Sequence, residues 1–312
     1  MESIGIQSQI RRNNIRSVIL LIAFPLLILL MVYAFLLFGL SQNASEANAG
    51  FILSTPYVLL GTALWFMIAW FFHASMIRVA TGSKPLERKE DKRIYNLLEN
   101  LCISQGMPMP KLYLIEDDSL NAFTSGMSPR FYSITLSRGI VNRLEDNELE
   151  GVLAHELTHI RNRDVRVLII SIIFVGIFSF LAEMAFRSLR YASGGRSRNG
   201  KGAGAVILVA IAITAVCYLI SMLLRFGISR SREYLADAGA AELTRDPHAL
   251  ADALEKISHD PAIEAIRSRD VAQLFIDNPK PAVQGFSWSK LFATHPPIEK
   301  RVEILRKMSH PA

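Results

Sequence analysis

Residues 155–159 read His-Glu-Leu-Thr-His and form the clearest chemical motif in the chain. His155 and His159 are four positions apart, so on a helix both imidazoles leave the same face and can share one tetrahedral metal ion. Glu156 follows the first histidine directly and is placed to act on a metal-bound water rather than to ligate. The complete His-Glu-x-x-His pattern therefore predicts metal-assisted hydrolysis of a peptide bond.

A helix must present these side chains, and the surrounding sequence predicts one over Asp146 to Arg161. Its apolar residues recur at helical spacing, which is typical of an element with one buried face. They are Leu149, Val152, Leu153, Leu157 and Ile160.

A catalytic zinc site needs a third protein ligand and an open position. Several downstream carboxylates are candidates, as are four histidines: His248, His259, His295 and His310. The segment 231–237 puts Glu233 and Asp237 on one helix face. Glu233 could ligate, while Asp237 could hydrogen-bond the far nitrogen of a ligand histidine and fix its orientation. A salt-bridged surface helix is the alternative, since Arg230 and Arg232 are adjacent, and spacing alone does not decide.

The combination of both motifs, separated by an apolar hairpin, resembles the HtpX group of heat-shock membrane metallopeptidases. These are relatives of the eukaryotic CAAX prenyl endopeptidases. The likeness extends over most of the chain. It includes two N-terminal apolar spans, Asn121-Ala122-Phe123, Arg163-Asp164, Thr294-His295-Pro296 and Arg301.

The resemblance implies that His155, His159 and Glu233 ligate one Zn²⁺ per chain. It also implies that Glu156 is the catalytic base, which takes a proton from water and later delivers it to the leaving amine. Asp237 would then support a ligand histidine from behind. Because histidine and carboxylate ligands also accept other divalent ions, the choice of zinc rests on the resemblance.

Members of this group also carry a late histidine and arginine near the scissile carbonyl, and His295 and Arg301 match those positions. Either side chain could stabilise the oxyanion of the tetrahedral intermediate. The alternative for His295 is a polar cap before Pro296 and Pro297. An extended substrate could pair with a strand edge near Ala122–Ser125 or Phe131–Leu136.

The chain has 312 residues, and its apolar fraction of 51% is concentrated in a few long blocks. Each block is long enough to cross a hydrocarbon core of about 30 Å as a helix. The first exceeds the apolar core of a signal peptide, about 7–15 residues, so an uncleaved span is expected. The two cysteines lie far apart and predict neither a disulfide framework nor a cysteine metal site. The blocks are 18–40, 56–74, 165–186 and 205–226.

Charge places the first two spans as a hairpin with cytoplasmic ends. Basic residues flank the hairpin on both sides, whereas its tip, 41–50, contains no lysine or arginine. The positive-inside rule therefore puts the N-terminus and the chain after residue 75 in the cytoplasm. The linker between the third and fourth blocks is also basic, which conflicts with an outside position. Two full spans are favoured there, and a partly re-entrant hairpin is the alternative.

The segment 87–164 reads as soluble, with a helix over Asp91–Cys102 and strands over Lys111–Ile115 and Phe131–Leu136. We therefore predict a mainly α integral membrane protein with four apolar helices and a cytoplasmic zincin-type α+β metalloprotease domain with a small β-sheet. Residues 1–75 and 165–226 form the two membrane hairpins. Residues 76–164 and 227–312 form the two parts of the catalytic domain.

The expected function is a membrane-bound zinc endopeptidase that cleaves misfolded or surplus membrane proteins at the cytoplasmic face of the bacterial inner membrane, as part of a stress response. Its partners would be the lipid bilayer and unfolded polypeptides, including its own loops. A dedicated maturation or prenyl-peptide protease is one alternative. A non-catalytic membrane scaffold with a structural metal site is another, although Glu156 would then have no task. Nucleic acid is disfavoured, because the basic residues of this chain, net charge +6, cluster beside the apolar blocks.

Overall fold

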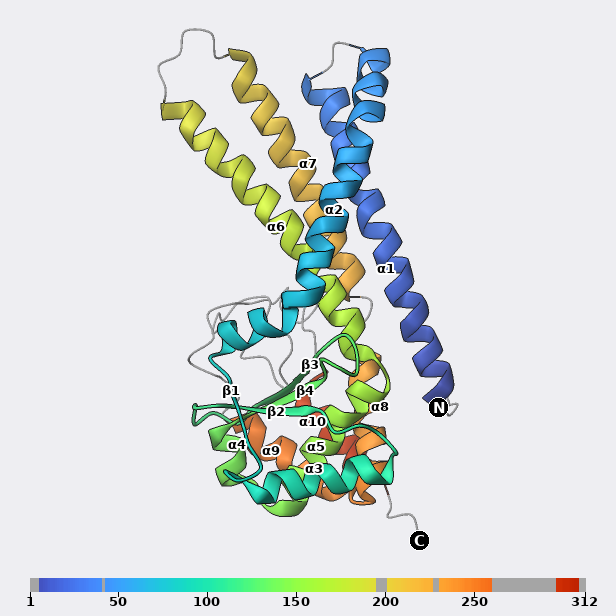
Figure 1. The fold of residues 1–312 in the computed structure, drawn as a ribbon, viewed down its shortest axis with the longest axis vertical. Helices are drawn as coiled ribbons and strands as arrows, with labels where there is room; N and C mark the ends of the chain where they lie inside the picture. The colour runs from blue at the N-terminus through green and yellow to red at the C-terminus, as the bar shows by residue number, and fades with distance from the viewer. Residues whose placement is uncertain (1–5, 41–42, 195–200, 227–229, 260–295, 309–312) are drawn as a thin grey trace. The chain divides into compact units, whose positions relative to one another are not determined.

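A computed structural model describes residues 6–40, 43–194, 201–226, 230–259 and 296–308 of the chain (Figure 1). These residues divide into two compact units. The first unit contains the described parts of 1–13, 72–169 and 228–312. The second unit contains the described parts of 14–71 and 170–227.

The first unit contains a small mixed sheet. Its strands are β1 Lys84–Pro85, β2 Lys111–Ile115, β3 Ala122–Ser125 and β4 Ser133–Ser137, in the spatial order β1-β2-β4-β3. The pair β2–β4 is parallel, whereas β1–β2 and β3–β4 are antiparallel. All residues of β3 and β4 are buried. The expectation of a small sheet is confirmed.

The strand predicted over Lys111–Ile115 is confirmed as β2. The strand predicted over Phe131–Leu136 is β4, which begins at Ser133 because Phe131 and Tyr132 belong to a turn closed on Ser128. β4 lies between β2 and β3, so the suggestion that it offers a free edge to a substrate is wrong. Within the described part of the chain, β3 is the outer strand on that side.

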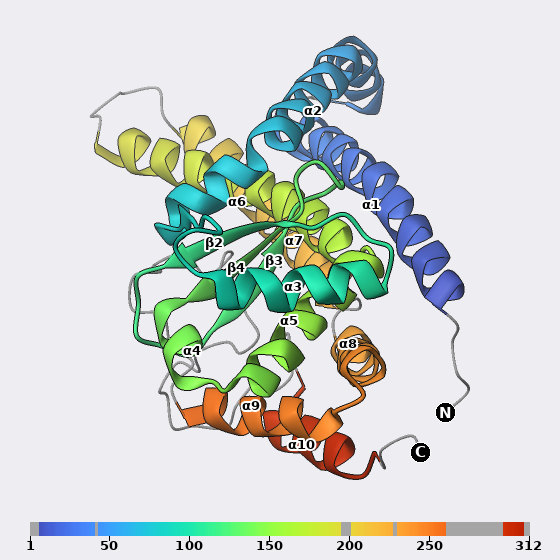
Figure 2. The same ribbon diagram turned by 60° about the horizontal axis from the view of Figure 1, so that its bottom comes forward.

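Six helices lie wholly within the first unit as described, beside the ends of three longer helices. The six are α3 Lys92–Ser104, α4 Arg138–Arg143, α5 Asp146–Arg161, α8 Arg230–Thr244, α9 Pro247–His259 and α10 Ile298–Arg306. In both views α3, α5, α9 and α10 lie on the same side of the sheet (Figures 1 and 2). The predicted bounds of the motif-bearing helix are those of α5.

Helix α5 is the centre of this unit, since it packs against α3, α8 and α9 and against strands β3 and β4. Its start is fixed by a capping box. The side chain of Glu145 accepts a hydrogen bond from the main-chain N–H of Glu148, and the side chain of Glu148 accepts one from the main-chain N–H of Glu145. Buried Leu149, Val152 and Leu153 fill the core around it. An element held on so many sides can present side chains at fixed positions.

The second unit is built from parts of four long helices: α1 Ile6–Phe35, α2 Ala44–Thr81, α6 Asp164–Gly194 and α7 Lys201–Phe226, with a short π-helix, Leu36–Leu40, after α1. Phe174 of α6 stacks on Phe24 of α1 at 4.6 Å between ring centroids and on Phe66 of α2 at 5.7 Å. These stacks join three of the helices.

Two segments of the described chain are long and apolar enough to cross a membrane, Ile10–Gly39 and Ala44–Thr81. They cover the first two predicted blocks, although α1 starts well before Val18. The other two predicted blocks fall on α6 and α7. Within α7, Leu208–Ile220 is a shorter apolar stretch. Full spans at these two blocks stay a prediction.

Candidate metal centre

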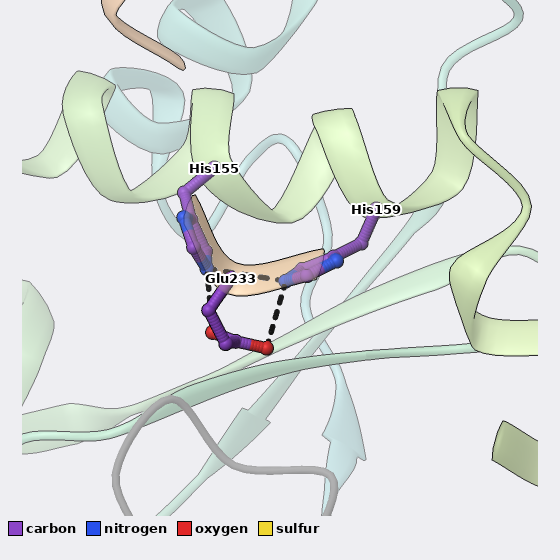
Figure 3. Close-up of side chains that lie close together, drawn as sticks. All are labelled: His155, His159 and Glu233. Carbon is purple, nitrogen blue, oxygen red and sulfur yellow. Dashed lines mark hydrogen bonds and ion pairs between the residues drawn. The ribbon is translucent and has the colours of Figure 1, made fainter. Parts of the chain in front are cut away.

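Three side chains converge below helix α5 (Figure 3). His155 and His159 project from the same side of α5 toward the carboxylate of Glu233, which comes from α8. The two Nε2 atoms are 3.1 Å apart. Glu233 places Oε2 at 3.6 Å from Nε2 of His155 and Oε1 at 3.8 Å from Nε2 of His159. Two nitrogens and one carboxylate thus face a common point.

This donor set fits a divalent metal ion. A tetrahedral ion with bonds of about 2.0–2.1 Å to histidine and carboxylate holds its donor atoms about 3.3–3.4 Å apart. The observed separations of 3.1 to 3.8 Å lie on either side of that value. His155 and Glu233 are buried, whereas the side chain of His159 is 13% exposed. Three protein donors are the number typical of a catalytic site, whereas structural zinc sites usually have four.

The far nitrogen of His155 faces Asp237, one turn after Glu233 on α8. Nδ1 of His155 lies 3.0 Å from Oδ1 of Asp237. A carboxylate in this position accepts the Nδ1–H and leaves the Nε2 lone pair pointing toward the metal point. The i, i+4 spacing of the two carboxylates therefore lets one helix contact both nitrogens of one imidazole.

Burial and partners act in opposite directions on this pair. Burial lowers the pKa of His155, but the neighbouring carboxylates of Asp237 and Glu233 outweigh it and raise the pKa to about 9. Burial raises the pKa of Asp237, but the charges of Arg301 and His155 outweigh it and lower that pKa below the usual aspartate range. Asp237 is therefore a carboxylate at neutral pH.

Arg301 of α10 is completely buried and lies behind Asp237 rather than open to solvent. Its Nε and Nη2 donate to the two oxygens of Asp237, and Nη1 lies 3.6 Å from Oε2 of Glu233. The guanidinium thus contacts the carboxylates of Glu233 and Asp237 on α8.

Glu156 points to strand β3, and its carboxylate is 2% exposed. The hydroxyl of Thr124 donates to Oε2 of Glu156 in a short hydrogen bond and also lies 3.2 Å from the main-chain oxygen of Glu156. A strand residue therefore fixes the carboxylate that follows the first ligand histidine.

Residues 88–309 of the sequence match a known family, described as peptidase family M48. The chain belongs to peptidase family M48. A relative named "Protease HtpX homolog" from Bacteroides fragilis is 55% identical, covering 98% of this chain and 100% of that protein. Another of the same name from Tropheryma whipplei is 34% identical over 97% of this chain and 98% of its own length.

Among solved structures, Ste24p of S. mikatae shares the fold of this M48 chain. The TM-score is 0.52 at 20% sequence identity, over 92% of this chain and 64% of that one. The chain thus spans less than two thirds of Ste24p, and the likeness extends to the fold alone.

The predicted resemblance to HtpX proteases is confirmed, and the chain is a membrane-bound metalloprotease that acts on polypeptides. As an M48 peptidase it is metal-dependent, and the cluster of His155, His159 and Glu233 is where the described residues could hold an ion.

Of the other predicted site residues, Asp237 and Arg301 lie beside the cluster, whereas His295 lies outside the described residues. Sequence reasoning for this M48 peptidase missed Thr124 as a partner of Glu156 and gave no role to Asp164, which faces His159. Asp164 was noticed only within a family pattern, and nothing local marked Thr124.

Proposed function

We propose that this M48 peptidase is a zinc endopeptidase in which His155, His159 and Glu233 hold the ion and Glu156 is the catalytic base. The observation that carries the proposal is the convergence of three donor atoms within 4.8 Å of one another from helices α5 and α8. Glu156 lies next to the first ligand in sequence, where a purely structural metal site would need no carboxylate. This argues against a non-catalytic scaffold.

When bound, the ion supplies Lewis acidity that polarises the scissile carbonyl and makes water nucleophilic near neutral pH. Glu156 accepts the proton of the attacking water. The Thr124 hydroxyl, which donates to Oε2, holds this carboxylate in place. The same carboxyl group then donates the proton to the leaving amine, so that it acts as general base and then as general acid.

Arg301 was expected near the scissile carbonyl. Its complete burial and its two hydrogen bonds to Asp237 favour a different task in the proposed mechanism. We assign it to hold Asp237, which in turn orients His155. His295 is kept as the candidate for oxyanion stabilisation, on the resemblance alone.

We further propose that catalysis takes place at the cytoplasmic face of a bacterial inner membrane. The basic flanks of the first apolar hairpin support this orientation. His159 and Glu233 must lie on one side of the bilayer, so the chain between them crosses it an even number of times. Helices α6 and α7 as two further spans satisfy this, with 76–164 and 227–312 together forming a zincin-type domain.

The proposed substrates are misfolded or surplus membrane proteins and other unfolded chains, as part of a stress response. Relatives named Protease HtpX homolog, 55% and 34% identical over nearly the whole chain, support a protease of this group, and the substrate class rests on the resemblance to that group. The fold likeness to Ste24p favours no particular substrate, so a maturation protease is not advanced as a second function.

The test is Glu156→Gln in the full chain purified in detergent, with cleavage of casein and of the chain itself measured beside the zinc content. We expect one zinc per chain and no cleavage. Glu150→Gln is the matched control, since Glu150 lies on the same helix and is only partly buried. Full proteolysis by Glu156→Gln would refute the mechanism, and zinc bound independently of His155 would refute the site.

A further inference from the structure

The second ligand histidine also has a carboxylate behind it. Nδ1 of His159 lies 3.2 Å from Oδ2 of Asp164, which is 1% exposed. Asp164 can approach His159 because α5 ends at Arg161 and the chain reverses at Arg163, whose φ of 60° lies in the left-handed region. A non-glycine residue there costs about 1–2 kcal/mol, so the turn is held by its surroundings.

The other oxygen of Asp164 is held from far away in the sequence. Nδ2 of Asn13, on α1, donates to Oδ1 of Asp164 at 2.5 Å and to the main-chain oxygen of Asn162 at 2.8 Å. Both partners are acceptors, so the orientation of the amide is settled by its two N–H groups. Asn162 is the C-cap of α5, so Asn13 donates one of its hydrogen bonds to the end of the motif helix. Asn13 itself is 0% exposed.

The two ligand histidines therefore have matching support. His155 is backed by Asp237, which receives hydrogen bonds from Arg301 of α10. His159 is backed by Asp164, which receives one from Asn13 of α1. In each case a buried carboxylate faces Nδ1, and a donor from a distant helix fixes that carboxylate.

We propose that Asn13 is a positioning residue for the metal, acting on His159 through Asp164. By holding Asp164, Asn13 keeps the Nδ1–H of His159 hydrogen-bonded and its Nε2 lone pair directed at the ion. The helix that begins the first candidate membrane span thereby contributes to metal affinity. This inference rests on the proposed function, because it requires His159 to be a ligand.

The test is a double-mutant cycle on the full chain in detergent, with zinc affinity measured by competition against a chelator. Asp164→Ala should weaken zinc binding about 10–100-fold, as is usual when the partner of a ligand histidine is removed. Asn13→Ala should weaken it by about tenfold, at the lower end of that range. The double variant should bind zinc as Asp164→Ala does, because Asn13 has no further effect once its target is gone.

A merely structural role gives a different pattern. If Asn13 only held α1 in place, Asn13→Ala would lower the melting temperature of the metal-free protein and leave the zinc affinity unchanged. In the double variant, the losses of stability from the two substitutions would then add. Either result would overturn the proposal. Asn13→Leu fills the same space without a donor and gives the same readout if Asn13→Ala folds poorly. Arg12→Gln is the matched control, since Arg12 is an exposed neighbour on α1.

Failure of this inference is distinguishable from failure of the proposed function. His159→Ala should remove stoichiometric zinc from the purified protein if His159 is a ligand. If wild type binds zinc, His159→Ala loses it and Asn13→Ala matches wild type, then only the role of Asn13 is wrong. If His159→Ala keeps wild-type affinity, the metal site itself is wrong.

Discussion

Arg301 and Asp237 form a buried, bidentate ion pair. Nε of Arg301 donates to Oδ2 of Asp237 at 2.8 Å, and Nη2 donates to Oδ1 at 2.7 Å. The side chains are 0% and 2% exposed. The same Oδ1 lies 3.0 Å from Nδ1 of His155. One carboxylate therefore joins the C-terminal helix α10 to the motif helix α5.

Removing Arg301 should destabilise the protein strongly. Arg301→Ala leaves the Asp237 carboxylate buried without its main counter-charge, which costs about 3–5 kcal/mol. The free energy of unfolding of the metal-free protein, from denaturant titration, measures this. Arg306→Ala on the same helix is the control, because Arg306 pairs with Asp252 at an exposed surface and such pairs contribute about 0–1 kcal/mol. Equal losses for the two variants would contradict a special role for Arg301.

The spacing of α5 and α8 should depend on Gly239. A Cβ at this position would lie 2.5 Å from Cγ2 of Thr158, a buried residue of the motif. Gly239→Ala should therefore push α8, with Glu233, away from α5. We expect a loss of about 1–3 kcal/mol in stability, typical of overpacking, together with weaker zinc binding in chelator competition.

Two further variants isolate the cause of that loss. Thr158→Ser removes the clashing methyl group but keeps Oγ1, which would lie 3.0 Å from the added Cβ, so it should restore part of both the stability and the zinc affinity of Gly239→Ala. Gly61→Ala, where an added Cβ meets nothing within 4 Å, should cause neither loss. If Thr158→Ser fails to rescue, the close approach of these two residues does not set the spacing.

Local features of the fold were predictable from the sequence. The periodic segment 146–161 became α5, and the apolar run 111–115 became β2, because in both the pattern matches what the core requires. The start of α1 was missed. Its first turns are polar and include Arg11 and Arg12. Basic residues beside an apolar block indicate a membrane flank both inside a helix and outside one, so they do not mark where the helix begins.

The candidate site was predictable where its residues share one helix face, as in His155 with His159 and Glu233 with Asp237. The partners of these residues were not predictable, since they arrive from elsewhere in the fold. Asn13 lies 151 positions from Asp164, and Thr124 lies 32 positions from Glu156. Such hydrogen bonds depend on tertiary packing, which leaves no periodic signal in a single sequence.

Thr124 should set the position of the general base. Thr124→Val keeps the shape of the side chain but removes the hydroxyl that donates to Oε2 of Glu156. A hydrogen bond to a charged group contributes about 1.5–3 kcal/mol, so kcat on a peptide substrate should fall about tenfold or more. Zinc content and KM should stay near wild type, because neither the ligands nor the metal point changes. Thr124→Ser keeps the donor and should retain most of the activity, and wild-type kcat in Thr124→Val would contradict this role.

The stability of the metal-free protein should depend on pH through His155. The neighbouring carboxylates of Asp237 and Glu233 outweigh burial and raise the pKa of His155 from its ordinary value of 6.5 to about 9. Because the folded pKa is the higher one, protonated His155 stabilises the folded state fully below pH 6.5, and this contribution is lost as pH rises through about 9. We therefore expect the melting temperature of the chelator-treated wild type, relative to that of His155→Gln, to be highest below pH 6.5 and to decline toward pH 9. Taking the difference between the two proteins removes the titration of groups that they share. A difference that stays constant across this window, or that grows with pH, would mean that His155 is not protonated in the folded metal-free protein.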